Sequence, residues 1–122
     1  MQIDIQTRNF PLSDARRSHI KRRLDSTLST REFHIHRVLV RLADVNGPRG
    51  GADKCCHIQV VLTNLPDVVI KDTEVDLYAA IDRAVDRAGR TTGRRLARHR
   101  IKSRSSGLYN IVSIDEYPNQ LD

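Results

Sequence analysis

Five arginines recur at helical spacing between Asp76 and Arg104. Their separations of 4, 3, 4 and 4 residues place them along one side of an α-helix. This arginine stripe consists of Arg83, Arg87, Arg90, Arg94 and Arg98. A guanidinium group is a planar fork that can bind a phosphate through two parallel hydrogen bonds. Acidic residues stop at Asp86, and every charged residue from Arg87 to Arg104 is positive. The pattern therefore predicts a polyanion-binding helix rather than a solvated face of mixed charge.

The opposite side of this predicted helix is apolar and indicates that the helix lies on a core. Its members are Leu77, Ile81, Val85, Ala88 and Leu96. A row of small residues, Gly89, Gly93 and Ala97, runs beside the arginine stripe. Each glycine costs about 1 kcal/mol relative to alanine in a helix interior. We interpret the row as a locally loosened helix, with close approach of an RNA strand or a second helix as the alternative.

Positive charge is concentrated in this segment. Residues 75–104 contain nine basic and three acidic residues, whereas residues 105–122 contain three acidic residues, within a chain of formal net charge +6. A local positive field favours a polyanionic partner such as a nucleic acid.

Length and composition predict a single domain with a small core, because the chain has 122 residues of which 39% are apolar. The N-terminal sequence MQIDIQTRNF has no apolar run of signal-peptide length, and no segment resembles a membrane span. We therefore expect a cytoplasmic protein without a membrane partner. The adjacent Cys55 and Cys56 would point to opposite faces of a strand, which disfavours a disulfide between them and fits a reducing compartment.

No set of residues predicts catalysis, a cofactor or a small-molecule substrate. A zinc site built from His34, His36, Cys55 and His57 can be imagined across a hairpin, but the ligand spacing does not support it, and we expect no metal. Asp82 and Asp86 are one helical turn apart beside the arginine stripe. We interpret them as ion-pair partners that orient the stripe's arginines.

The remaining elements follow from periodicity and turn residues. Alternating Ile3 and Ile5 predict a strand, and Ser13 is a suitable N-cap for a basic helix that runs to about Leu28. Two alternating segments, 34–45 and 56–63, predict a hairpin around the glycine-rich loop 46–53, in which Arg49 is a weak candidate for a nucleic-acid contact. A further strand is expected over 68–71, followed by a capping box of Thr73 and Asp76 before the long helix.

This order, β-α-β-β-β-α, predicts an α+β fold. We expect a four-stranded sheet with both helices packed on one face and a wet opposite face. Residues 1–104 are predicted to form the domain. Residues 105–122 are predicted to form a C-terminal tail that begins with a flexible Ser-Ser-Gly and is partly docked or flexible.

Two segments resemble a known family. LYAAID (77–82), followed by Asp86-Arg87 and the later arginines of the stripe, is similar to the second helix of the ribosome hibernation-promoting and ribosome-associated inhibitor family, also called the sigma-54 modulation protein family. The segment Ala15-Arg16-Arg17-Ser18-His19-Ile20, ending in Arg23-Leu24, lines up with that family's first helix. The resemblance covers about residues 1–102, and the family has the same β-α-β-β-β-α order.

The resemblance implies a non-enzymatic inhibitor of translation that binds the small ribosomal subunit between head and body. Family members occupy the channel of messenger RNA and of the A- and P-site transfer RNAs. The positions implied to contact ribosomal RNA are Arg87, Arg90, Arg94 and Arg98 of the second helix and Arg17 and Arg23 of the first. Arg83 belongs to the stripe by spacing alone. The chain looks like a short form, because the residues after Arg104 are too few for the dimerisation domain of long members.

The chain also departs from the family pattern. Arg16 stands where an apolar residue is preferred, and Ala88 and Thr92 replace two leucines on the buried side of the second helix. Loss of a core leucine costs about 2–5 kcal/mol unless other side chains fill the space. Two alternatives stay open: a general double-stranded RNA-binding module, and a protein-interaction module whose small-residue row docks another helix.

Overall fold

The computed structural model describes the backbone of residues 1–8, 11–44 and 54–109, and the side chains of these residues as far as 100. The elements follow the predicted order, with one addition. They are β1 (Gln2–Arg8), α1 (Asp14–Leu28), the 3-10 helix η1 (Ser29–His34), β2 (Ile35–Asp44), β3 (Lys54–Leu62), β4 (Val68–Glu74) and α2 (Leu77–Tyr109). The short helix η1, between α1 and β2, was not predicted. The loop around Arg49 lies outside the described residues.

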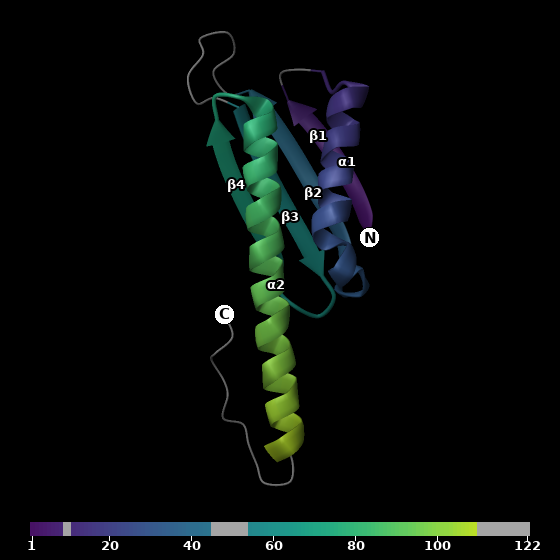
Figure 1. Ribbon diagram of the computed structural model, residues 1–122, viewed down its shortest axis with the longest axis vertical. Coiled ribbons are helices and arrows are strands. Elements are labelled where there is room, and N and C mark those ends of the chain that lie inside the picture. Colours follow the sequence, from purple (N-terminus) through teal and green to yellow (C-terminus); the bar gives the residue numbers. More distant parts are fainter. Residues whose placement is uncertain (9–10, 45–53, 110–122) are drawn as a thin grey trace. The chain divides into compact units, whose positions relative to one another are not determined.

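The four strands form one sheet in the order β1-β2-β3-β4. Strand β1 pairs with β2 in parallel, and the other two pairs are antiparallel. Parallel neighbours need a crossover connection, which α1 supplies. Both helices cover the same face of the sheet (Figure 1), which confirms the predicted α+β fold. The chain divides into two compact units, Met1–Gly89 and Arg90–Asp122, and α2 begins in the first and continues in the second.

The core of the Met1–Gly89 unit lies between the sheet and the helices. Alternate strand residues such as Val40 and Ile58 are 1% and 0% exposed, and Leu24 of α1 and Ile81 of α2 are fully buried against them. Ala88 belongs to the same cluster with no exposed surface. The alanine that stands where a leucine was expected is therefore fully enclosed in the core. Thr92, at the second such position in the other unit, is also fully buried.

Both helices begin with a capping side chain. Ser13 Oγ accepts a hydrogen bond from the backbone N–H of Arg16 at 3.2 Å, as predicted. Asp76 Oδ2 accepts one from the backbone N–H of Ala79 at 3.1 Å. The predicted capping box of Thr73 and Asp76 is wrong, because Thr73 still belongs to β4 and Asp76 is itself the residue that caps α2.

Helix α2 continues past Arg104 and ends at Tyr109, so the Ser-Ser-Gly segment expected to be flexible is helical. Residues 110–122 lie outside the described part of the chain, and the boundary and role of the tail stay predictions.

Gly89 permits close approach of the two helices. A Cβ atom built on Gly89 would lie 2.4 Å from Thr27 Cγ2 of α1, much closer than carbon atoms approach in proteins. At Gly89, the small residue is explained by close approach of α1, a neighbouring helix of the same chain. This agrees with the alternative interpretation, close approach of a second helix, rather than with a locally loosened helix.

Replacing Gly89 with alanine should destabilise the fold, although alanine is the better helix former by about 1 kcal/mol. Overpacking a tight contact typically costs about 1–3 kcal/mol, so we expect Gly89→Ala to lower the free energy of unfolding by about 1 kcal/mol in urea titrations. Combining it with Thr27→Ser, which removes the clashing methyl group, should recover stability relative to Gly89→Ala. Thr27→Ser alone is the control, and a Gly89→Ala protein more stable than wild type would contradict the contact.

Candidate nucleic-acid interface

The first two arginines of the stripe are held by acidic residues of β4. Arg87 Nη1 lies 2.8 Å from Asp72 Oδ2 and donates to the backbone oxygen of Lys71 at 3.0 Å. Arg83 Nε lies 3.2 Å from Glu74 Oε2 and 3.9 Å from Asp72 Oδ1. The Asp72 side chain is only 10% exposed, so its carboxylate is partly enclosed beneath the two guanidinium groups. Much of the charge of Arg83 and Arg87 is therefore neutralised within the chain.

These acids were not singled out from the sequence, although a signal for them was present. Asp72 and Glu74 continue the alternation of Val68 and Ile70, which are buried on the helix-covered face of β4. Two carboxylates placed at the end of a core-facing row require cationic partners. The overlying helix supplies them with Arg83 and Arg87.

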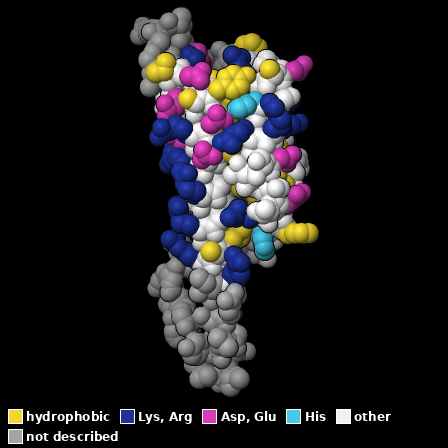
Figure 2. Space-filling view, in the orientation of Figure 1, with side chains coloured by type: hydrophobic (Ala, Val, Ile, Leu, Met, Phe, Trp, Pro, Cys, Tyr) yellow, Lys and Arg dark blue, Asp and Glu magenta, His cyan; other side chains and the backbone are white. Residues whose placement is uncertain are grey.

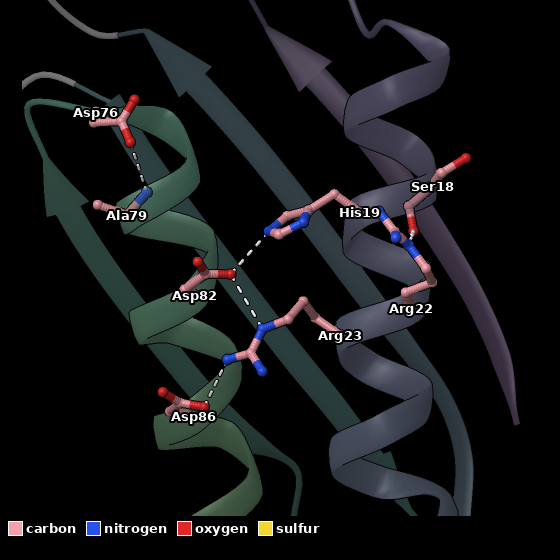
Figure 3. Close-up of polar contacts among 8 residues, drawn as sticks. All are labelled: Ser18, His19, Arg22, Arg23, Asp76, Ala79, Asp82 and Asp86. Atoms are coloured by element: carbon pink, nitrogen blue, oxygen red, sulfur yellow. Dashed lines mark hydrogen bonds and ion pairs between the residues drawn. The ribbon is translucent and has the colours of Figure 1, made fainter.

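A second polar cluster joins α1 to α2 (Figure 3). Asp82 Oδ1 of α2 lies 2.8 Å from His19 Nε2 and accepts a hydrogen bond from Arg23 Nε at 3.1 Å. Arg23 Nη2 donates to Asp86 Oδ1 at 2.8 Å. The His19 ring also packs edge-on against Tyr78, with ring centroids 4.8 Å apart. The residues quoted for the family resemblance thus meet at one contact between the helices.

Arg23 links α1 to α2 through its ion pairs with Asp82 and Asp86. Partial desolvation lowers the pKa of Arg23, but the hydrogen bond and charge of Asp86, together with those of Asp82, more than offset this and raise the pKa above its usual value. Asp82 and Asp86 were expected to orient the arginines of their own helix. Their observed partner is instead Arg23 of α1. A role of Arg23 in RNA contact stays a prediction, and its guanidinium group is engaged by two carboxylates.

The other predicted positions are exposed. Arg17 projects from α1, and Arg90, Arg94 and Arg98 project from the part of α2 that follows Gly89. Arg94 Nη2 donates to Thr91 Oγ1 at 3.4 Å, within its own helix. Among the described residues, neither Arg17 nor Arg90 makes an ion pair. Figure 2 shows Lys and Arg side chains following α2.

Thiol and metal chemistry has little support in the described part of the chain. Burial, with the nearby Cys55 and Asp72, raises the pKa of the Cys56 thiol to about 12, so it is not a nucleophile at neutral pH. Both cysteines are unpaired thiols. Within residues 1–8, 11–44 and 54–100, no group of three His, Cys, Asp or Glu side chains is placed to hold a metal ion. No helix in the described residues is sufficiently long and apolar to cross a membrane.

Solved structures similar to this chain include a protein from Thermus thermophilus and one from Coxiella burnetii. The N-terminal domain of Thermus thermophilus Protein Y is 29% identical, with a TM-score of 0.64 over 77% of this chain and 98% of that one. A ribosomal subunit interface protein from Coxiella burnetii is 16% identical, with a TM-score of 0.69 over 80% of this chain and 99% of that one, and at this identity it supports the fold alone. Comparison with curated proteins finds no match.

A family model gives the broader assignment. The model described as Sigma 54 modulation protein / S30EA ribosomal protein matches residues 3–102, which include both helices' motif segments and all four strands except Gln2 at the start of β1. The chain therefore belongs to the Sigma 54 modulation protein / S30EA ribosomal protein family.

Proposed function

We propose that this chain is a non-enzymatic hibernation factor that inhibits translation by binding ribosomal RNA of the small subunit. It binds in the channel that messenger RNA and transfer RNAs otherwise occupy. It acts in the cytoplasm of stressed or idle cells. Support comes from its membership of a ribosome-associated family and from the likeness to a Protein Y domain over most of the chain. The observation that carries the proposal is the exposed run of arginines after Gly89.

The spacing of these arginines suits a phosphate backbone. Residues four apart in an α-helix are separated by about 6 Å along the axis, so Arg90 and Arg98 lie about 12 Å apart along α2. No acidic residue occurs between Arg87 and Arg104. Such a row can contact successive phosphates of one strand and gives affinity without reading bases.

The ion pairs divide the stripe into two parts with different tasks. Arg83 and Arg87 are bound to β4 carboxylates and position α2 on the sheet. Arg90 and Arg94 project from a segment without acidic residues, so their charge is available to RNA, and Arg98 is exposed in the same segment. Arg17 of α1 is the further candidate contact on the first helix.

Removing charge from the second part should weaken RNA binding more than removing it from the first. Each phosphate contact contributes a slope of about 0.7–0.9 to the fall of log K with log salt. We expect Arg90→Gln/Arg94→Gln to reduce this slope by about 1.4–1.8 in cosedimentation with purified small subunits.

The matched variant is Arg83→Gln/Arg87→Gln, which removes the same charge from the same helix. It should change the slope less, because those guanidinium groups are already neutralised. Circular dichroism and thermal unfolding establish that both variants are folded. Unaltered binding by Arg90→Gln/Arg94→Gln would refute the proposal, and equal affinity of the wild type for any RNA duplex would favour a general RNA-binding module.

Replacing Asp72 with asparagine should tighten RNA binding while it weakens the fold. Asparagine keeps the shape but removes the charge that holds Arg87, so the Arg87 guanidinium group becomes more available to phosphates, whereas Arg83 keeps its ion pair with Glu74. We expect a steeper salt dependence of binding to small subunits and a loss of about 1–3 kcal/mol in the free energy of unfolding.

Asp25→Asn is the control for this experiment, because it removes one negative charge from an exposed position of α1. If the two variants increase affinity equally, net charge alone explains the result and the Asp72 ion pairs have no specific effect.

A further inference from the structure

The face of the sheet that the helices leave uncovered is also basic. Strand register places Gln6, Arg41, His57 and Lys71 side by side in one row across all four strands. The next row toward the ends of β1 and β2 contains Arg8, Ala43, Cys55 and Thr73. Arg8, Arg41 and Lys71 are exposed. These two rows, here called the basic rows, form the half of the open face that carries no acidic residue.

The cations of the basic rows are not balanced within the domain. Among the described residues, the side chains of Arg8, Arg41 and Lys71 make no ion pair or hydrogen bond. Asp4 lies in a different row and contacts Gln2 at 3.5 Å. Like charges on neighbouring strands repel one another. On the helix-covered face, by contrast, carboxylates of β4 pair with Arg83 and Arg87 of α2. The open face therefore has an excess of positive charge that an external anion would balance.

The surface at the ends of β1 and β2 is hollowed. A hollow of about 360 Å³ is lined by Gln6, Thr7, Arg8, Arg41, Leu42 and Ala43. Gln6, Arg8 and Arg41 contribute to the lining of this hollow. Guanidinium and amide groups are donors that suit phosphate oxygens. Lys71 lies two strands from Arg41 in the same row, which corresponds to about 10 Å. One anionic strand that crosses the sheet can therefore reach both.

The chemistry of this face favours a phosphate backbone over bases or an apolar partner. No Phe, Tyr or Trp occurs in the sheet rows described, so the stacking rings of a base-binding sheet are missing there. The exposed apolar side chain Val69 lies in the row of Asp4, which is next to the basic rows but not part of them. Arginine and lysine without stacking rings are typical of contacts to sugar and phosphate.

We propose that the basic rows bind a second segment of RNA backbone, through Arg8, Arg41 and Lys71, on the side of the sheet opposite to the helices. This inference rests on the proposed function, because it supposes that RNA surrounds the bound chain. In the Met1–Gly89 unit, α1 with Arg17 covers one side of the sheet and the basic rows form the other. The chain would then be held between two RNA segments rather than lie on one.

The test compares Arg41→Gln/Lys71→Gln with wild type in binding to purified small subunits. Loss of two phosphate contacts should reduce the salt slope by about 1.4–1.8 and weaken binding about 20-fold at about 0.15 M salt. Hydroxyl-radical footprinting of the ribosomal RNA should show loss of one set of protected sugars. A different set should be lost with Arg90→Gln/Arg94→Gln.

Two control variants define the effect. Arg41→Lys/Lys71→Arg keeps both charges and should retain most of the affinity, and Arg31→Gln removes one charge outside the sheet and should leave the footprint unchanged. Both substituted residues of the test variant are exposed, and thermal unfolding checks that the fold is intact.

The possible outcomes separate this inference from the proposed function. If wild type binds and Arg41→Gln/Lys71→Gln binds with the same affinity, slope and footprint, the second surface is wrong and the proposed function stands. If the variant binds more weakly but protects the same sugars as the wild type, these side chains contact something other than RNA backbone, which also overturns the inference. Failure of the wild type to bind small subunits would overturn both.

Discussion

Two helices rich in arginine lie side by side on one face of this sheet, and their mutual repulsion is the constraint that the structure must satisfy. Carboxylates placed between and beneath the helices resolve it. Asp82 and Asp86 of α2 receive Arg23 of α1, and Asp72 of β4 receives Arg87 of α2. Exposed ion pairs are individually worth about 0.2–1 kcal/mol. Their main effect is to set the orientation of the helices, while the buried core supplies most of the stability.

The same ion pairs decide which arginines are available to a partner. A stripe of five arginines at uniform helical spacing suggests five equivalent contacts, yet the structure makes them unequal. Arg83 and Arg87 are paired with β4, whereas Arg90 projects from a segment without acidic neighbours. We therefore expect affinity for RNA to depend both on the arginines and on the absence of carboxylates close enough to pair with them. The open sheet face follows the same principle, because its basic rows have no carboxylate.

Local patterns predicted most of the fold. Alternation of apolar residues located the strands, Ser13 predicted the start of α1, and the β-α-β-β-β-α order led to a sheet covered on one face. What could not be predicted depends on contacts between distant residues. Arg23 pairs with Asp82 and Asp86 across two helices. Predicting this pairing requires knowing how closely the helices pack, and the spacing of residues along the sequence does not give that distance. The role of Gly89 likewise depends on Thr27 of the other helix, and β4 continued through Thr73 as far as Glu74, into the predicted capping box.

We propose that this chain occupies the RNA channel of the small ribosomal subunit through its exposed arginines. The most direct measurement is the affinity of the labelled chain for purified small subunits that are either empty or loaded with messenger RNA and P-site transfer RNA. We expect the chain to bind empty subunits and to be displaced strongly by the messenger RNA and transfer RNA of loaded subunits. Equal affinity for empty and loaded subunits would contradict it, because the chain would then bind elsewhere on the ribosome.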